Sequence, residues 1–217
     1  MLKHTFELNQ QRLEDEVLAL GSQVEEMLTL SVQTLRERNI KEAMHLIANN
    51  SSFNQKCTII ETDTLTLLET EWPTDHDLYV LASILEIAQE LEHIHDLARC
   101  IAEINLKLDT ETLFDQFADF LLLAKMTGNM LHKALKAFSD KNLDLACFVP
   151  GQHREVNGLY QRIHQALLES VKTNQLSVNQ AFYLSQVGQQ LGRVADRTIN
   201  ICEWVVFSIT GEMRKLN

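Results

Sequence analysis

The chain has 217 residues, enough for one or two modest domains, and 45% of them are apolar, which argues against intrinsic disorder. The 19 basic and 30 acidic residues give a formal net charge of −11, which argues against a protein that binds nucleic acid or an anionic membrane, because both partners need basic faces. No apolar run approaches the roughly 20 residues that cross a bilayer. The N-terminal residues form no apolar signal segment, so we expect a cytoplasmic protein without membrane insertion.

Helix-breaking residues are scarce. The 2 prolines and 7 glycines are too few for the frequent turns of β-sandwiches and barrels, whereas long helices need few interruptions. The 4 cysteines lie tens of residues apart without paired spacing, so we expect reduced thiols that behave as small apolar side chains. The composition therefore favours an all-α protein.

Helix-capping residues divide the chain into six long predicted helices. Asn39, Thr74, Thr112 and Ser177 each stand three positions before an acid or amide, and Asn142 is a similar cap without one. The predicted helices cover residues 6–37, 39–70, 74–107, 111–139, 142–173 and 177–213. A helix of about 30 residues is about 45 Å long, a length typical of helical bundles.

A proline interrupts the fifth predicted helix. Inside a helix a proline removes one hydrogen bond and clashes with the preceding turn. We therefore expect a kink or a late helix start at Pro150-Gly151, and not a domain boundary.

The last three predicted helices repeat the first three. The apolar 3-4 stripe that starts at Ala43 has a counterpart starting at Ala146, 103 positions later, and the stripe that starts at Ile84 has a counterpart starting at Leu184, 100 positions later. Such stripes must be buried against one another at shallow crossing angles. We predict a tandem of two antiparallel three-helix bundles, arranged end to end or side by side. The predicted domains are residues 1–108 and 109–217.

Acidic residues mark the candidate site. Glu92 and Asp96 are four positions apart on one predicted helix, so they are neighbours that repel each other unless solvent or a cation separates them. Asp96 has its counterpart in Asp196, and the pair Glu103/Glu203 repeats in the same way. A repeated acidic position is more typical of a site, or of its remnant, than of an ordinary solvated face.

Polar residues also occupy equivalent positions in the apolar stripes. Asn50 lies in the stripe of the second predicted helix, and its counterpart His153 is polar too. Each has an amide one turn later, at Asn54 and Asn157. A lone polar residue in such a stripe usually sets the register of packing. Two at equivalent places favour a functional role.

Three segments, taken in order, resemble the PhoU family of phosphate uptake regulators. Leu13 to Leu28 is similar to the family's first helix and Leu85 to Glu103 to its third, while Leu191 to Val205, followed by Thr210-Gly211-Glu212, is similar to its last. The resemblance implies two three-helix bundles, which agrees with the pattern above. It also implies regulation without catalysis. PhoU-like proteins are cytoplasmic, often homodimeric, and dampen phosphate uptake by contacting the phosphate ABC transporter and its sensor histidine kinase.

The resemblance further implies a metal-associated pattern, in which two acids stand four positions apart on the second and third helices of each repeat. Only Glu92 and Asp96 keep this pattern. The other positions read Asn50 and Asn54, His153 and Asn157, and Gly192 and Asp196. We therefore expect no multinuclear cluster, and at most one divalent or iron cation at Glu92 and Asp96. The candidate metal ligands are Glu92, Asp96, His153 and Asp196.

Two other functions are compatible with the sequence. The pairs Glu42/His45, Glu90/His93 and Glu92/His95 match the Glu-x-x-His spacing of carboxylate-bridged di-iron bundles. We expect Glu92 and His95 to flank the apolar stripe and not to point into the bundle centre, which argues against such an enzyme. A helical adaptor without a phosphate role is the other alternative. No Gly-rich phosphate loop or nucleophile elbow indicates an enzyme, and the net charge argues against direct phosphate binding.

Overall fold

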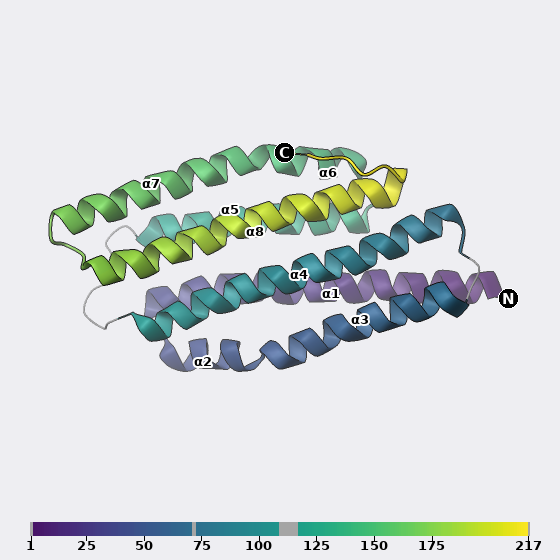
Figure 1. Ribbon diagram of the computed structural model, residues 1–217, viewed down its shortest axis with the longest axis horizontal. Helices are drawn as coiled ribbons and strands as arrows, with labels where there is room; N and C mark the ends of the chain where they lie inside the picture. Colours follow the sequence, from purple (N-terminus) through teal and green to yellow (C-terminus); the bar gives the residue numbers. More distant parts are fainter. Residues whose placement is uncertain (1, 71–72, 109–116, 217) are drawn as a thin grey trace.

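The computed structural model describes residues 2–70, 73–108 and 117–216, which form helices joined by short connections (Figure 1). The first repeat consists of α1 (Leu2–Glu37), α2 (Ile40–Ala48), α3 (Asn50–Thr70) and α4 (Asp75–Lys107). The second consists of α5 (Phe117–Ser139), α6 (Leu143–Phe148), the 3-10 helix η1 (Val149–Gln152), α7 (His153–Lys172) and α8 (Val178–Thr210). The described residues contain no strand, so the all-α prediction is confirmed. In these same ranges, no helix combines the length and apolar character that crossing a bilayer requires.

Each repeat consists of three long helical rods, and the second rod (α2–α3 in the first repeat, α6–α7 in the second) is interrupted at an equivalent place. In the first repeat α2 ends before Asn49 and α3 begins at Asn50, so the continuous helix expected over residues 39–70 is wrong. The local run of Asn and Ser explains the break, because these side chains compete for backbone hydrogen bonds. In the second repeat the α-helix gives way at Pro150 to the 3-10 helix η1, which confirms the predicted interruption.

Identical turns join the first two rods of each repeat. Arg38 and Lys141 occupy the left-handed region, with φ of 55° and 50°. The following residues cap the next helix: Asn39 accepts a hydrogen bond from the amide of Glu42 at 3.1 Å, and Asn142 accepts one from Leu145 at 3.0 Å. These turns lie 103 positions apart, as the stripes do. The predicted cap at Thr112 and the helix start at residue 111 lie outside the described residues.

The third rods also begin as predicted. Thr74 forms a capping box with Asp77, and Ser177 forms one with Gln180. In each box the N-cap side chain accepts from a backbone amide and the partner side chain accepts in return. The N-terminal ends of α4 and α8 are therefore determined by their local sequence.

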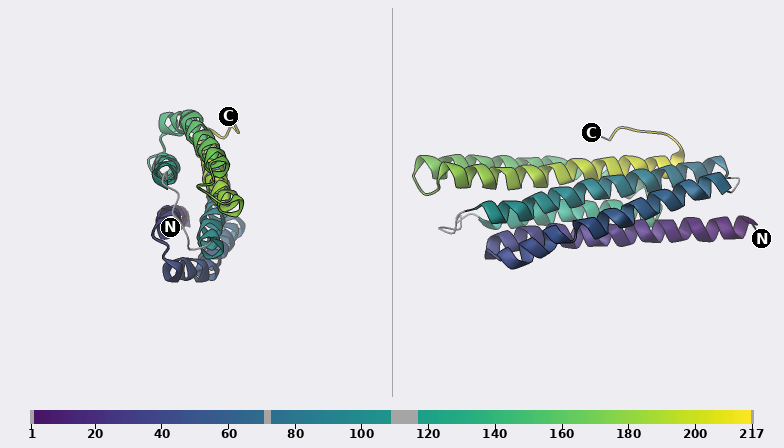
Figure 2. Two further views of the ribbon diagram at one scale, coloured as in Figure 1. Left: turned by 90° about the vertical axis from the view of Figure 1, so that its left-hand side faces the viewer. Right: turned by 60° about the horizontal axis from the view of Figure 1, so that its bottom comes forward.

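The two repeats lie side by side and run antiparallel (Figure 1). The main contact between them is made by α4 and α8, and a second one by α1 and α5. Seen end-on, α2–α3 and α6–α7 lie at the two outer ends (Figure 2). Consequently α4 is covered by α1, α3 and α8 together. It buries far more than one narrow stripe, from Val80 to Asn105.

Polar contacts cross the interface between the repeats. The Glu90 carboxylate accepts hydrogen bonds from the side-chain amide of Asn200 at 2.9 Å and from Arg197 at 3.4 Å. The Ser83 hydroxyl donates to the carbonyl of Trp204 at 3.0 Å. Since Glu90 is only 8% exposed, these donors stabilise a buried acid that would otherwise be costly.

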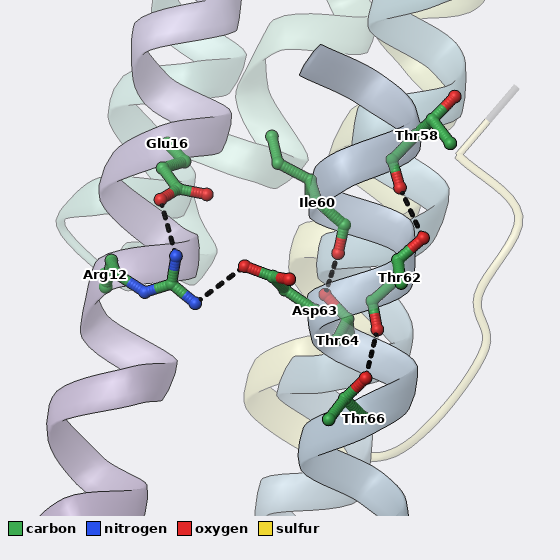
Figure 3. Close-up of polar contacts among 8 residues, drawn as sticks. All are labelled: Arg12, Glu16, Thr58, Ile60, Thr62, Asp63, Thr64 and Thr66. Atoms are coloured by element: carbon green, nitrogen blue, oxygen red, sulfur yellow. Dashed lines mark hydrogen bonds and ion pairs between the residues drawn. The ribbon is translucent and has the colours of Figure 1, made fainter. Parts of the chain in front are cut away.

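Within the first repeat, one arginine connects α1 to α3 (Figure 3). Arg12 donates to Glu16 on its own helix at 3.0 Å and to Asp63 on α3 at 2.8 Å. On the outer face of α3, the hydroxyls of Thr62 and Thr66 donate to the carbonyls of the threonines four positions earlier. The threonine hydroxyls on this exposed face therefore find their acceptors within α3 itself.

Candidate functional site

The first candidate pair lies where α3 packs on α4. Glu92 is partly buried, and desolvation raises the pKa of its carboxyl group, with further increases from the negative charges of Asp96 and Glu61. The same environment, burial first and then Glu92 and Glu61, raises the pKa of the Cys57 thiol to about 12. Glu92 therefore shares its surroundings with other acids, as its spacing from Asp96 predicted.

Asp96 already has a cationic neighbour. Arg99 donates from Nε to Asp96 at 3.3 Å and also pairs with Glu103, both on its own helix. Asp96 and Glu103 are therefore balanced by one guanidinium. Glu92 has no comparable cation among the described contacts.

Three buried polar atoms in this seam lack a hydrogen-bond partner. They are the side-chain oxygens of Asn50 and Asn54 on α3 and the Nδ1 atom of His95 on α4. Amide and carboxylate oxygens are suitable ligands for hard cations. Nevertheless, no group of three His, Cys, Asp or Glu side chains is gathered for a metal ion anywhere in residues 2–70, 73–108 and 117–216. The residues present therefore fit one weakly held cation better than a cluster.

His95 is buried between α3 and α4, which corrects the expectation that it does not point into the bundle. It is 4% exposed, and its ring stacks on Phe53 with a centroid distance of 4.0 Å and an interplanar angle of 6°. Burial, the largest contribution, lowers its pKa to about 4, so the imidazole is neutral at pH 7. The expectation was wrong because α4 is covered on several sides, so positions that flank its stripe are also buried. Glu92 does remain at the edge, partly exposed.

The second candidate pair joins α7 to α8. Nε2 of His153, the first residue of α7, lies 2.8 Å from Oδ1 of Asp196. An open cleft of about 790 Å³ adjoins this pair and is also lined by Arg154, Asn200 and Leu216. The structure thus brings two of the four predicted site residues into direct contact. The other two, Glu92 and Asp96, lie on α4, and no group of three His, Cys, Asp or Glu side chains in the described residues joins the two pairs.

Gly192 stands where the first repeat has Glu92. A Cβ atom at Gly192 would meet nothing within 4 Å, so there is space at this position for a larger side chain. With Asn157 also neutral, Asp196 is the single acid left at the four family positions of this repeat. The His153–Asp196 pair is therefore the contact that remains there.

Sequence reasoning missed the role of Glu90. Its counterpart in the second repeat is Gln190, so a polar residue stands directly before Leu91 and Leu191 in both repeats. That repetition was the available signal. The Oε1 atom of Gln190 is buried without a partner, because the first repeat has Leu97 and Cys100 where the second has the donors Arg197 and Asn200.

The comparisons with known proteins agree with this architecture. The family model described as "PhoU domain" matches residues 17–104 and 120–205. A "Phosphate-specific transport system accessory protein PhoU homolog" from Clostridium acetobutylicum is 28% identical over 218 residues and is covered completely, as is this chain. The accessory protein PhoU of Escherichia coli is 22% identical, over 95% of this chain and 86% of its own length.

Solved structures share the fold. The crystal structure of the phosphate transport system regulatory protein PhoU from Streptococcus pneumoniae superposes with a TM-score of 0.89 at 26% identity, over 96% of this chain and 99% of that one. PhoU from Pseudomonas aeruginosa gives 0.88 at 22% identity, over 95% and 100%. Because the family model covers both repeats and most of the sequence, the chain belongs to the PhoU family.

Proposed function

We propose that this protein is an accessory regulator of a phosphate-specific transport system and that it limits phosphate uptake. The proposal rests mainly on one observation: a relative named as an accessory protein of a phosphate-specific transport system matches this chain over its whole length, and the PhoU family model matches both repeats. A regulator needs surfaces more than it needs reactive groups.

The finer part of the proposal is docking in the cytoplasm to the phosphate ABC transporter, to its sensor histidine kinase, or to both. Long antiparallel helices present extended faces, and such faces suit helical or extended partner segments. The net charge of −11 favours partners with basic surfaces. A homodimer belongs to the same proposal. Exposed apolar side chains at Val178 and Phe182, one turn apart on α8, offer a surface for a second copy.

Co-purification tests the docking. The tagged chain is co-expressed with the transporter's ATPase subunit and, separately, with the sensor kinase, and an unrelated acidic helical bundle serves as control. We expect at least one of the two partners to be retained by the chain and not by the control. If a folded chain retains neither, the helical adaptor without a phosphate role becomes the better account.

We also propose one weakly held divalent cation at Glu92 and Asp96. Support comes from the raised pKa of Glu92 beside like charges, and from the unpartnered oxygens of Asn50 and Asn54 in the same seam. Such a cation would relieve the repulsion between the two carboxylates. Because Arg99 already compensates Asp96, binding will be weak.

A further inference from the structure

The C-terminal segment after α8 turns back along the molecule. Gly211 ends the helix with φ of 72°, a left-handed cap that favours glycine, and the ring of Tyr79 lies against it. Residues 212–216 have no regular secondary structure, and they run back over the second repeat toward α7 (Figure 1). Leu216 packs on the core and lines the cleft beside His153 and Asp196.

A single buried acid holds this segment. The Glu203 carboxylate accepts from Nζ of Lys215 at 2.8 Å and from the backbone amide of Leu216 at 3.0 Å. The Glu203 side chain is 4% exposed, whereas that of Lys215 is 78% exposed. The contact therefore combines a buried acceptor with a donor that solvent can reach.

In the first repeat the same acid is paired within its own helix. Glu103, the counterpart of Glu203, keeps 31% of its side chain exposed and pairs with Arg99 on its own helix. In the second repeat the position of Arg99 is taken by Ile199, which cannot pair with an acid. Lys215 of the tail therefore supplies the cation that the helix itself lacks.

We propose that the place occupied by the tail, from the Glu203 carboxylate to the neighbouring cleft between α7 and α8, is a groove that binds an extended segment of a partner protein. That segment carries a basic residue followed by an aliphatic residue, and the chain's own tail occupies the site as a competing strap. The tail shows the required chemistry directly: Lys215 pairs with the buried carboxylate, and Leu216 packs on the core at the edge of the cleft. The idea relies on the proposed function only in taking the partner to be a protein.

The strap should be displaceable, because two adjacent residues supply its contacts with Glu203. A tethered segment competes at an effective concentration on the order of millimolar. The wild-type groove should therefore bind a free peptide weakly until the strap is released.

Peptide binding to the full-length purified chain tests the proposal. The probe is a fluorescein-labelled synthetic peptide with the sequence of residues 211–217, followed by fluorescence anisotropy. We expect it to bind a released variant, Lys215→Ala with Leu216→Ala, at least 10-fold more tightly than it binds the wild type. Adding Glu203→Gln to the released variant should remove that gain, and adding Glu103→Gln, the matched change in the first repeat, should not.

A peptide that itself carries Lys215→Ala gives a second test that does not depend on how Glu203→Gln folds. It should bind the released variant at least 10-fold more weakly than the native peptide does. Equal affinity of wild type and released variant, no binding to either, or equal loss with Glu103→Gln would overturn the proposal. So would a wild-type dimer that becomes monomeric in the released variant, since the groove would then hold the tail of a second copy. All of these measurements use the isolated chain, so their failure leaves the role in phosphate uptake standing.

Discussion

Replacing Gly21 with alanine tests how closely α1 of the first repeat approaches α5 of the second. A Cβ atom at Gly21 would lie 2.4 Å from Cδ1 and 3.1 Å from Cδ2 of Leu135. Ordinary contacts between carbon atoms are about 3.5–4.0 Å, so the Leu135 side chain must move by about 1 Å or more. Leu135 is only 5% exposed, which leaves it little room.

The expected magnitude is a balance of two effects. Overpacking a core costs about 1–3 kcal/mol, while alanine stabilises a helix interior by about 0.5–1 kcal/mol relative to glycine. Gly21→Ala should therefore lower the free energy of unfolding by about 0–2 kcal/mol. Gly128 in α5 provides the matched control, because a Cβ there meets nothing within 4 Å. Gly128→Ala should raise the free energy of unfolding by about 0.5–1 kcal/mol.

Denaturant unfolding followed by circular dichroism measures both variants, with the slope m checked for constancy. The difference between them isolates the cost of the close approach, since the gain in helix propensity is common to both. We expect Gly21→Ala to be the less stable by about 1–3 kcal/mol. Equal stabilisation of the two variants would refute the close packing of α1 on α5.

Four further outcomes are expected. Lys141→Gly should stabilise the fold by about 0.5–1 kcal/mol in denaturant unfolding, because relief of the left-handed φ of 50° exceeds the entropic cost of glycine; a loss of stability would contradict this. Glu90→Ala should cost about 2–3 kcal/mol by leaving the partly buried donors Arg197 and Asn200 without their acceptor, and Arg197→Ala should cost less, because Asn200 still donates to Glu90; the reverse order would show that the acid does not join the repeats. The pKa of His95 is about 4 in the fold against 6.5 normally, so the unfolded chain binds the proton first as pH falls. The His95 contribution, up to about 3 kcal/mol, is complete above pH 6.5 and should be lost between pH 6.5 and 4, and His95→Phe should flatten that slope in unfolding curves recorded across pH. Mn²⁺ should raise the melting temperature of the wild type but not of Glu92→Gln, and an equal shift in both would remove the proposed cation from this site.

The repeated architecture could be predicted from the sequence because it depends on local patterns, namely apolar stripes and helix caps. The stripes that begin at Ala43 and Ile84 recur in the second half, and the caps at Asn39 and Asn142 mark equivalent helix starts. Pro150 likewise indicated the interruption of the fifth predicted helix. Such features depend on residues a few positions apart, so the sequence shows them directly.

Features that depend on contacts between the repeats were less accessible. The sequence showed two bundles but left open whether they lie end to end or side by side. The side-by-side arrangement makes α4 a central helix, and it buries Glu90 against α8 at a position that a narrow stripe would leave at the surface. Only the structure could therefore show that Glu90 meets Asn200.

The candidate site was predicted in part. His153 and Asp196 were both named as candidates from the sequence, but their direct contact at 2.8 Å is visible only in the structure. The covering of Glu203 by Lys215 was not foreseen, because nothing in the local sequence says where an irregular segment will return. Its single trace in the sequence is Ile199, which leaves Glu203 without a cation on its own helix.

The rate of phosphate uptake in host cells that lack this protein tests the proposed role most directly. Uptake of labelled phosphate is measured in phosphate-rich medium, in the presence of a functional transporter, for the parent, for the deletion and for the deletion supplied with the gene. Faster uptake in the deletion, returned to the parental rate by the supplied gene, is the predicted result. Equal uptake in all three strains would contradict a regulator that limits phosphate entry.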